Sequence, residues 1–206
     1  MKALITHVFL LLSLVGCATT SEIKTSTNSM EAKQISRLQD ISWNEVTIDN
    51  TVNINAVIDE QTQQLTTNTI SSPVLGFSVK NSTANINISV TAMVKDLAVF
   101  APTLAVYDQD FNLLKTFDSS LFNYDPNNLR KGEVLSGDIQ LLLPVTVNSI
   151  YVIVYTTDED IARTTTTLHP AKAYAIARNN VPPAVTDPVA IHSSYGQIYL
   201  SFSNQA

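Results

Sequence analysis

The sequence predicts a mainly β fold, an antiparallel, jelly-roll-like β-sandwich with two or three short helices. Segments such as residues 85–91 alternate strictly between apolar and polar side chains, whereas segments such as residues 150–155 are continuously apolar and bounded by turn-forming residues. Alternation is typical of a strand that is buried on one face, and a short continuous apolar run is typical of a strand that is buried on both faces. Two sheets packed around one core accommodate both kinds of strand.

Residues 1–16 have the composition of a lipoprotein signal peptide. A lysine at position 2 precedes an apolar segment, residues 3–15, that is too short to span a bilayer. The sequence Leu-Val-Gly-Cys that follows resembles the lipobox of bacterial lipoproteins and places a lipid on Cys17. Each buried methylene of an acyl chain contributes about 0.8 kcal/mol, so we expect permanent attachment. The alternative is a soluble periplasmic protein in which Cys17 is incidental.

The remaining chain divides into a tether and one domain. Ala18 follows Cys17 where aspartate would be typical of an inner-membrane lipoprotein, so we expect the periplasmic side of the outer membrane of a Gram-negative bacterium. Residues 17–29 are mostly polar, as is typical of a flexible tether. Residues 30–206 are long enough to bury the core of a single β-sandwich domain.

The pattern of apolar residues predicts the order of elements in this domain. Residues 30–38 can form a short helix with three apolar residues on one side. The expected strands that follow are residues 41–48, 52–58, 77–79, 85–91, 103–107, 139–143, 150–155 and 195–202. The more continuously apolar runs at 103–107, 139–143 and 150–155 are expected to lie in the centre of the sheets.

Two further helices are expected between the later strands. Thr157, followed by three acidic residues, is typical of a capping box and predicts a helix to about Thr165. His169 and Pro170 begin the next helix, because proline is favoured at the first helical position. The alanine-rich segment to Arg178 favours a helix, and paired prolines soon after it end the helix.

Composition excludes several classes of function. The chain has 12 Lys and Arg against 18 Asp and Glu, and its net charge of −6 comes without the clustered positive residues that nucleic acid requires. A single cysteine, assigned to the lipid, leaves no disulfide, thiol nucleophile or cysteine zinc site.

The sequence also contains no recognisable catalytic motif. Beyond the signal peptide the histidines are His169, at a helix start, and His192, in an expected loop. No hydrolase, metalloprotease or phosphate-loop motif is present. Consecutive acids at 158–160 point in different directions on a helix and compensate its dipole. We therefore expect no enzyme activity, no cofactor and no metal.

One segment, residues 117–126, has the composition of a recognition surface. Aromatic rings can stack on the apolar faces of sugars while polar groups meet the hydroxyls, which makes Phe117, Phe122, Tyr124 and Asp125 candidate ligand-binding residues. The alternative interpretation is that the rings pin this connection onto the sandwich.

Several blocks of sequence, in their order and spacing, resemble the maltose operon periplasmic protein family over residues 40–202. They are Val-Phe-Ala-Pro at 99–102, Asp-Gln at 108–109, Ser-Ser with Phe and Tyr at 119–124, Tyr-Val through Thr-Thr and Asp at 151–160, Pro-Ala-Lys-Ala-Tyr-Ala at 170–175 and Asp-Pro-Val-Ala at 187–190. The resemblance implies an envelope protein linked genetically to maltose and maltodextrin uptake, and it brings no catalytic residues. At least one member of the family differs in having an ordinary cleavable signal, and a linker and helical tail after the sandwich, where this chain ends at Ala206.

Two functions of different classes are consistent with these observations. In the first, the protein is a non-enzymatic accessory of maltose or maltodextrin uptake that binds carbohydrate, with Phe122 and Tyr124 as stacking residues. In the second, it is a structural or interaction lipoprotein that docks on an envelope complex such as a porin or transporter. A concave site with grouped rings would favour a sugar, and a flat apolar patch would favour a protein partner. The operon implied by the resemblance favours the first.

Overall fold

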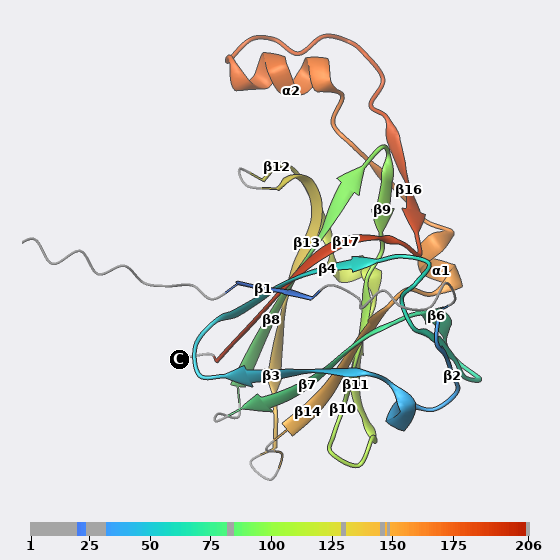
Figure 1. The fold of residues 1–206 in the computed structure, drawn as a ribbon. Coiled ribbons are helices and arrows are strands. Elements are labelled where there is room, and N and C mark those ends of the chain that lie inside the picture. Colours follow the sequence, from blue (N-terminus) through green and yellow to red (C-terminus); the bar gives the residue numbers. More distant parts are fainter. Residues whose placement is uncertain are drawn as a thin grey trace, which may run out of the picture.

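Two large β-sheets pack face to face, and a small third sheet covers the outer face of one of them (Figure 1). The structure is a computed structural model, and it describes residues 20–23, 32–81, 85–128, 131–144, 147 and 149–204. The expected signal peptide and the lipid-attachment residue Cys17 lie outside the described residues.

The larger sheet contains nine strands, and β17 lies between β4 and β8 within it. Its main path runs β1 (Thr20–Ile23), β4 (Val52–Ile58), β17 (Gly196–Asn204), β8 (Asn85–Lys95), β9 (Ala98–Phe100), β16 (Val189–Ser193) and β15 (Thr164–Thr166), while β13 (Gly132–Leu142) pairs with β8 and β12 (Asn123–Asn128) pairs with β13. In this register Leu200 of β17 lies opposite Ile54 of β4 on one side and Val90 of β8 on the other.

The second sheet contains five strands and the third contains three. The second runs β11 (Leu113–Phe117), β10 (Thr103–Tyr107), β14 (Ser149–Tyr155), β7 (Leu75–Asn81) and β3 (Trp43–Ile48), and the third runs β2 (Gln34–Ile35), β5 (Gln64–Thr66) and β6 (Ser71–Pro73). Most of the described pairs are antiparallel, and β1 with β4, β3 with β7, β2 with β5, and β9 with β16 are parallel. The predicted mainly β sandwich is confirmed, with sheets of mixed direction.

Strand β14 shows how the layers are built. Ile150, Val152 and Val154 face the core between the two large sheets, whereas Ile153 and Tyr155 face a second core beneath the three-stranded sheet. Alternate residues of a strand point to opposite faces, so a strand with an apolar layer on both sides must be continuously apolar. The predictions for residues 103–107 and 150–155 are confirmed for this reason.

The third continuously apolar run, residues 139–143, lies in a different environment. Residues 139–142 pair with β8 alone, because β12 covers only the earlier half of β13. Ile139 and Leu141 are buried, but the side chain of Leu142 is 82% exposed. The central position expected for residues 139–143 is therefore wrong, since among the described strands only β8 pairs with this end of β13.

Near the N-terminus the structure differs from the sequence predictions at two places. Thr20–Ile23, inside the expected tether of residues 17–29, forms β1 beside β4, because backbone groups can pair with an open strand edge whatever the side chains are. In the expected helix of residues 30–38, the described part contains β2 and the start of a 3-10 turn, η1 (Leu38–Asp40). Ile35 is buried in the second core, and this packing overrides a weak helical preference.

The two later helices begin where the sequence predicts. Helix α1 (Asp158–Ile161) has Thr157 as its N-cap in a full capping box, and it ends before the predicted Thr165 because the β-branched threonines form β15. Helix α2 (Pro170–Ala177) has His169 as its N-cap and lies beyond the ends of β9 and β16, away from both large sheets (Figure 1). Neither helix, nor any other in the described part of the chain, is long and apolar enough to cross a membrane.

Candidate functional site

The structure separates the four candidate ligand-binding residues into buried and half-buried pairs. Phe117 ends β11 and Phe122 follows the 3-10 turn η2 (Ser119–Leu121), and both rings belong to the core between the large sheets, with 6% and 7% of their surface exposed. A Cβ atom on Gly137 would lie only 2.9 Å from the Phe122 ring, so the glycine allows the ring to approach β13 closely. Neither phenylalanine offers a free face to a sugar, and both pin this connection onto the sandwich.

Tyr124 and Asp125 lie on β12 and are half-buried. The Tyr124 hydroxyl donates to Oε1 of Glu133 at 3.0 Å and accepts from the backbone amide of Leu168 at 2.9 Å. Its ring packs against the main core, and burial raises the pKa of Tyr124. The hydroxyl therefore ties β12 to the segment that leads into α2, and both of its hydrogen-bonding roles are occupied.

A buried carboxylate joins three parts of the chain close to this segment. Asp160 in α1 is 2% exposed, and its oxygens accept hydrogen bonds from Thr103 Oγ1 at 2.7 Å, Thr157 Oγ1 at 2.7 Å and Ser119 Oγ. Burial alone would raise the pKa of Asp160, but the donated hydrogen bonds outweigh burial and lower it. The carboxylate is held ionised and connects β10, η2 and α1.

His192 completes this buried network, in β16 and not in the expected loop. Its Nδ1 atom lies 2.8 Å from the backbone oxygen of Asp160, and its Nε2 atom lies 2.9 Å from Thr165 Oγ1. In a hydrolase triad the serine would contact the imidazole and the carboxylate would orient it. Here Ser119 donates to the carboxylate instead, and the imidazole contacts a backbone carbonyl and a threonine. The geometry is that of a structural network.

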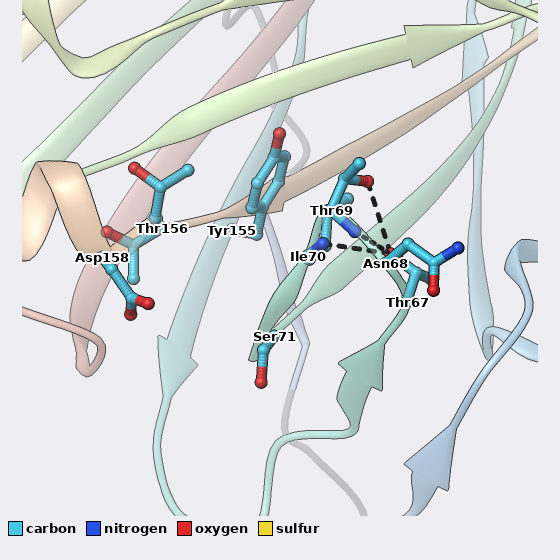
Figure 2. Close-up of a pocket in the computed structure, with 9 residues that line it drawn as sticks. Thr67, Asn68, Thr69, Ile70, Ser71, Tyr155, Thr156 and Asp158 are labelled. Atoms are coloured by element: carbon cyan, nitrogen blue, oxygen red, sulfur yellow. Dashed lines mark hydrogen bonds between the residues drawn. The ribbon is translucent and has the colours of Figure 1, made fainter.

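A small polar pocket lies beside the start of α1, between two separate segments of the chain. It has a volume of about 200 Å³ and is lined by residues 67–71 and 155–158. Figure 2 shows Thr156 and Asp158 on one side and Thr67, Asn68, Thr69 and Ile70 on the other. We call this hollow the hydroxyl pocket, because five of its nine lining residues are threonine or serine.

The walls of the hydroxyl pocket differ in how their polar groups are satisfied. Thr67 Oγ1 accepts from the backbone amides of Thr69 at 3.2 Å and Ile70 at 3.0 Å, which holds the loop in place. On the opposite wall, Thr156 Oγ1 is fully buried and has no hydrogen-bond partner within the described residues. Burial raises the pKa of Tyr155 to about 12, so its hydroxyl stays protonated at neutral pH. The pocket can exchange hydrogen bonds with a small polyhydroxylated ligand.

Sequence reasoning missed this pocket. Its residues come from a threonine-rich loop without a motif and from the segment between the end of β14 and the start of α1, where the capping box predicts a helix and no binding site. Only the pairing of sheets that brings residues 67–71 beside residues 155–158 creates the hollow. Across the described ranges, no group of three or more His, Cys, Asp or Glu residues could hold a metal ion.

Comparison with known proteins decides the family. The model of the family described as maltose operon periplasmic protein precursor (MalM) matches residues 69–202. The chain belongs to this family. The resemblance seen in the sequence blocks is thereby confirmed, and the matched range includes both walls of the hydroxyl pocket except for Thr67 and Asn68.

Two curated relatives are named maltose operon periplasmic protein. The protein from Escherichia coli K12 is 31% identical over 187 residues, and the protein from Salmonella typhimurium LT2 is 30% identical over 187 residues. Each match covers 90% of this chain but 60% and 61% of the relative. This chain therefore spans about three fifths of the length of these periplasmic relatives.

Among solved structures, the pre-peptidase C-terminal domain of collagenase from Bacillus anthracis is similar at 11% identity and a TM-score of 0.35, covering 80% of this chain and 95% of that domain. The periplasmic lysozyme inhibitor PliG from Aeromonas hydrophila is similar at 10% identity and a TM-score of 0.33, covering 79% and 97%. Scores this low support no argument about function.

Proposed function

We propose that this protein is a non-enzymatic accessory of maltose and maltodextrin uptake, anchored through a lipid on Cys17 to the periplasmic side of the outer membrane, and that it binds carbohydrate in the hydroxyl pocket. Membership of the family and the names of the relatives support the link to the maltose system and the periplasm. The lipobox supports the anchor.

The observation that carries the carbohydrate assignment is the unpartnered hydroxyl of Thr156 on the wall of the hydroxyl pocket. Nearly all buried polar atoms in native proteins have a hydrogen-bond partner, and an unsatisfied one costs about 1–3 kcal/mol. Less than 1 Å² of this oxygen is accessible, so a ligand hydroxyl supplies the missing bond once the Thr156 side chain turns toward the pocket. Because the pocket volume of about 200 Å³ lies below the roughly 300–1,000 Å³ typical of drug-sized ligands, one terminal glucosyl unit is the largest group that we expect inside.

The neighbouring groups support the same ligand class. Asn68 and Asp158 are exposed at opposite walls of the pocket and can meet further sugar hydroxyls as donor and acceptor. The rest of the lining is too polar for an apolar ligand. A glucosyl terminus presents hydroxyls on every edge, which matches hydroxyl and amide groups on both walls.

The test is calorimetric titration of the full chain with maltose, maltotriose and maltohexaose. The protein should be purified in an amine-oxide detergent, since a maltoside detergent would compete for the site. We expect saturable heat, with affinity reduced about tenfold in Thr156→Val, which removes one hydrogen bond to the ligand. Thr66→Val, an exposed threonine outside the pocket, is the matched control and should bind like the parent.

Two results would contradict this function. One is an absence of heat with all three sugars up to about millimolar concentration, the weak end of the affinities that small ligands show. The other is binding that Thr156→Val leaves unchanged, which would place the ligand elsewhere on the protein.

A second candidate function, docking on an envelope complex, is favoured by apolar residues exposed on and around α2. The side chains involved are Tyr174, Ile176, Val181, Val185, Val189 and Ile191, with exposed fractions from 36% to 91%. Such residues in one region mark protein interfaces more often than ordinary surface. In-cell crosslinking from α2 that captures a porin or transporter, combined with no sugar binding, would favour this function over the first.

A further inference from the structure

Three aromatic rings from separate parts of the chain meet on the outer face of the five-stranded sheet, beside the second core. Trp43 comes from β3, Tyr151 from β14 and Phe111 from the β10–β11 hairpin. The ring centroids of Phe111 and Tyr151 lie 4.4 Å apart and stacked, those of Trp43 and Tyr151 lie 4.7 Å apart, and those of Trp43 and Phe111 lie 5.9 Å apart. All three side chains are half-buried. We call this group the aromatic platform.

Phe111 reaches the platform through an unfavourable backbone conformation. Its φ angle is +61°, in the left-handed region that bulky side chains rarely adopt. Asp108 holds the turn, because its Oδ1 atom accepts from the backbone amides of Asp110 and Asn112, each at 2.9 Å. Its Oδ2 atom accepts from Nδ2 of Asn112 at 3.0 Å. The hairpin is thus built to hold this ring in place, as strained residues at functional sites often are.

The platform is not explained by the hydrophobic cores alone. Trp43 and Tyr151 pack against the second core, but Phe111 contributes to neither core. The indole Nε1 of Trp43 is buried and has no acceptor in the part of the chain that the structure describes.

The sheet places polar side chains beside the rings. In the register of β3, β7 and β14, Tyr151 lies opposite Ser78, and Ser78 lies opposite Glu45. Residues opposite one another in a sheet point to the same face, so Ser78 and the exposed Glu45 border the platform. Lys80, which lies two residues beyond Ser78 on the same face, contacts Glu45 at 3.8 Å. An apolar ring surface edged by hydroxyl, carboxylate and ammonium groups matches a pyranose, which has apolar faces and hydroxylated edges.

We propose that the aromatic platform is a second carbohydrate subsite, on which a glucosyl unit of an α-glucan stacks against Phe111 and Trp43. The choice of glucosyl rests on the proposed function, whereas the stacking of a pyranose rests on the platform itself. Tyr151 and Tyr155 of the hydroxyl pocket are four residues apart on β14, or about 13 Å. Between them Ile153 is fully buried beneath the three-stranded sheet, so the two subsites are separate.

The tryptophan of the platform provides the assay, because Trp43 is the single tryptophan of the chain. The full chain in amine-oxide detergent is titrated with maltohexaose while tryptophan emission and heat are followed. We expect a saturable change in emission. Phe111→Gly should weaken it about tenfold, since stacked aromatic contacts contribute up to about 1.5 kcal/mol beyond the area they bury. Glycine accepts the left-handed conformation, so Phe111→Gly should remain folded by circular dichroism.

Matched variants separate this proposal from the pocket. Leu113→Ala removes another exposed apolar side chain, two residues further along the same hairpin, and should leave the emission change intact. An emission change that persists in Thr156→Val supports the platform whether or not the pocket binds. If heat is seen without any emission change, and Phe111→Gly binds like the parent, the platform proposal is overturned and the pocket stands. If neither heat nor emission changes, both proposals fall.

Discussion

Asp160 offers the sharpest test of how the sandwich is held together, because one carboxylate serves donors that are far apart in sequence. It accepts from Thr103, which is 57 residues earlier, and from Ser119, which is 41 residues earlier. It also forms the capping box of α1 with Thr157. Replacing Asp160 with alanine removes all of these acceptors at once.

The magnitude follows from what the substitution leaves behind. Thr103 and Ser119 are 2% and 8% exposed, so their hydroxyls lose their acceptor with little access to water. Each such loss costs about 1–3 kcal/mol, and the lost bond from the Thr157 amide, the Asp160 half of the capping box, adds about 1 kcal/mol. We expect Asp160→Ala to lower the free energy of unfolding by about 4 kcal/mol. Asp160→Asn keeps one acceptor oxygen and should cost about half as much.

The same contact predicts a dependence on pH. The pKa of Asp160 is lowered in the folded protein, so its ionised form is the one that the fold stabilises. This contribution is complete above the unfolded pKa of about 3.9 and is lost as the pH falls through the lower folded value. The stability difference between the parent and Asp160→Asn should therefore shrink in acid.

Urea unfolding followed by Trp43 emission measures both quantities, at pH 7 and at steps below about pH 4. Glu159→Gln is the control, since Glu159 is an exposed neighbour in the same helix. A loss of less than about 1 kcal/mol in Asp160→Ala, the value of an ordinary neutral hydrogen bond, would refute this account. A difference in the free energy of unfolding between the parent and Asp160→Asn that stays the same at every pH would also refute this account.

Three further predictions concern separate features. Tyr124→Phe removes a hydroxyl that binds the Leu168 amide and should destabilise the fold by about 1 kcal/mol in urea, and no change would show that this bond is dispensable. Gly76→Ala would place a Cβ atom 2.5 Å from Ile41 Cγ2 and should cost about 1–3 kcal/mol, seen as a lower thermal midpoint, whereas an unchanged midpoint would mean that the site relaxes freely. Cys17→Ser should move the protein from the membrane fraction to the soluble fraction, and retention in membranes would contradict the lipid anchor.

Local chemistry made part of this structure predictable. Alternation identified β4 and β8, and the capping box and the proline at the first helical position identified the starts of α1 and α2. These signals depend only on residues that are close in sequence, so they could be recognised without knowing the tertiary structure. Thr165 was misassigned because a helix start says little about where a short helix ends when β-branched residues follow it.

The site depends on contacts between distant segments, and no local pattern contains those. A period of two shows which side chains share a face but not which strand lies alongside, so the order β4-β17-β8 could not be foreseen. Phe122 and Phe117 have the composition of a sugar-binding surface, yet burial decides their role, and burial follows from sheet packing. Asp160 was recognised only as part of the capping box of α1, and His192 belonged to no motif, because their other partners lie in β10, η2 and β15.

The position of β17 has a consequence for when this domain can fold. Residues 196–204 are the latest described strand to be synthesised, yet they occupy an interior place in the nine-stranded sheet, hydrogen-bonded to β4 and β8 on either side. Until they arrive, β4 and β8 each have an unpaired edge, and the loop to be closed between β4 and β17 exceeds 100 residues, which makes such pairing slow. The nine-stranded sheet cannot be completed before these residues have been synthesised, so we expect it to close only after the whole domain has left the ribosome.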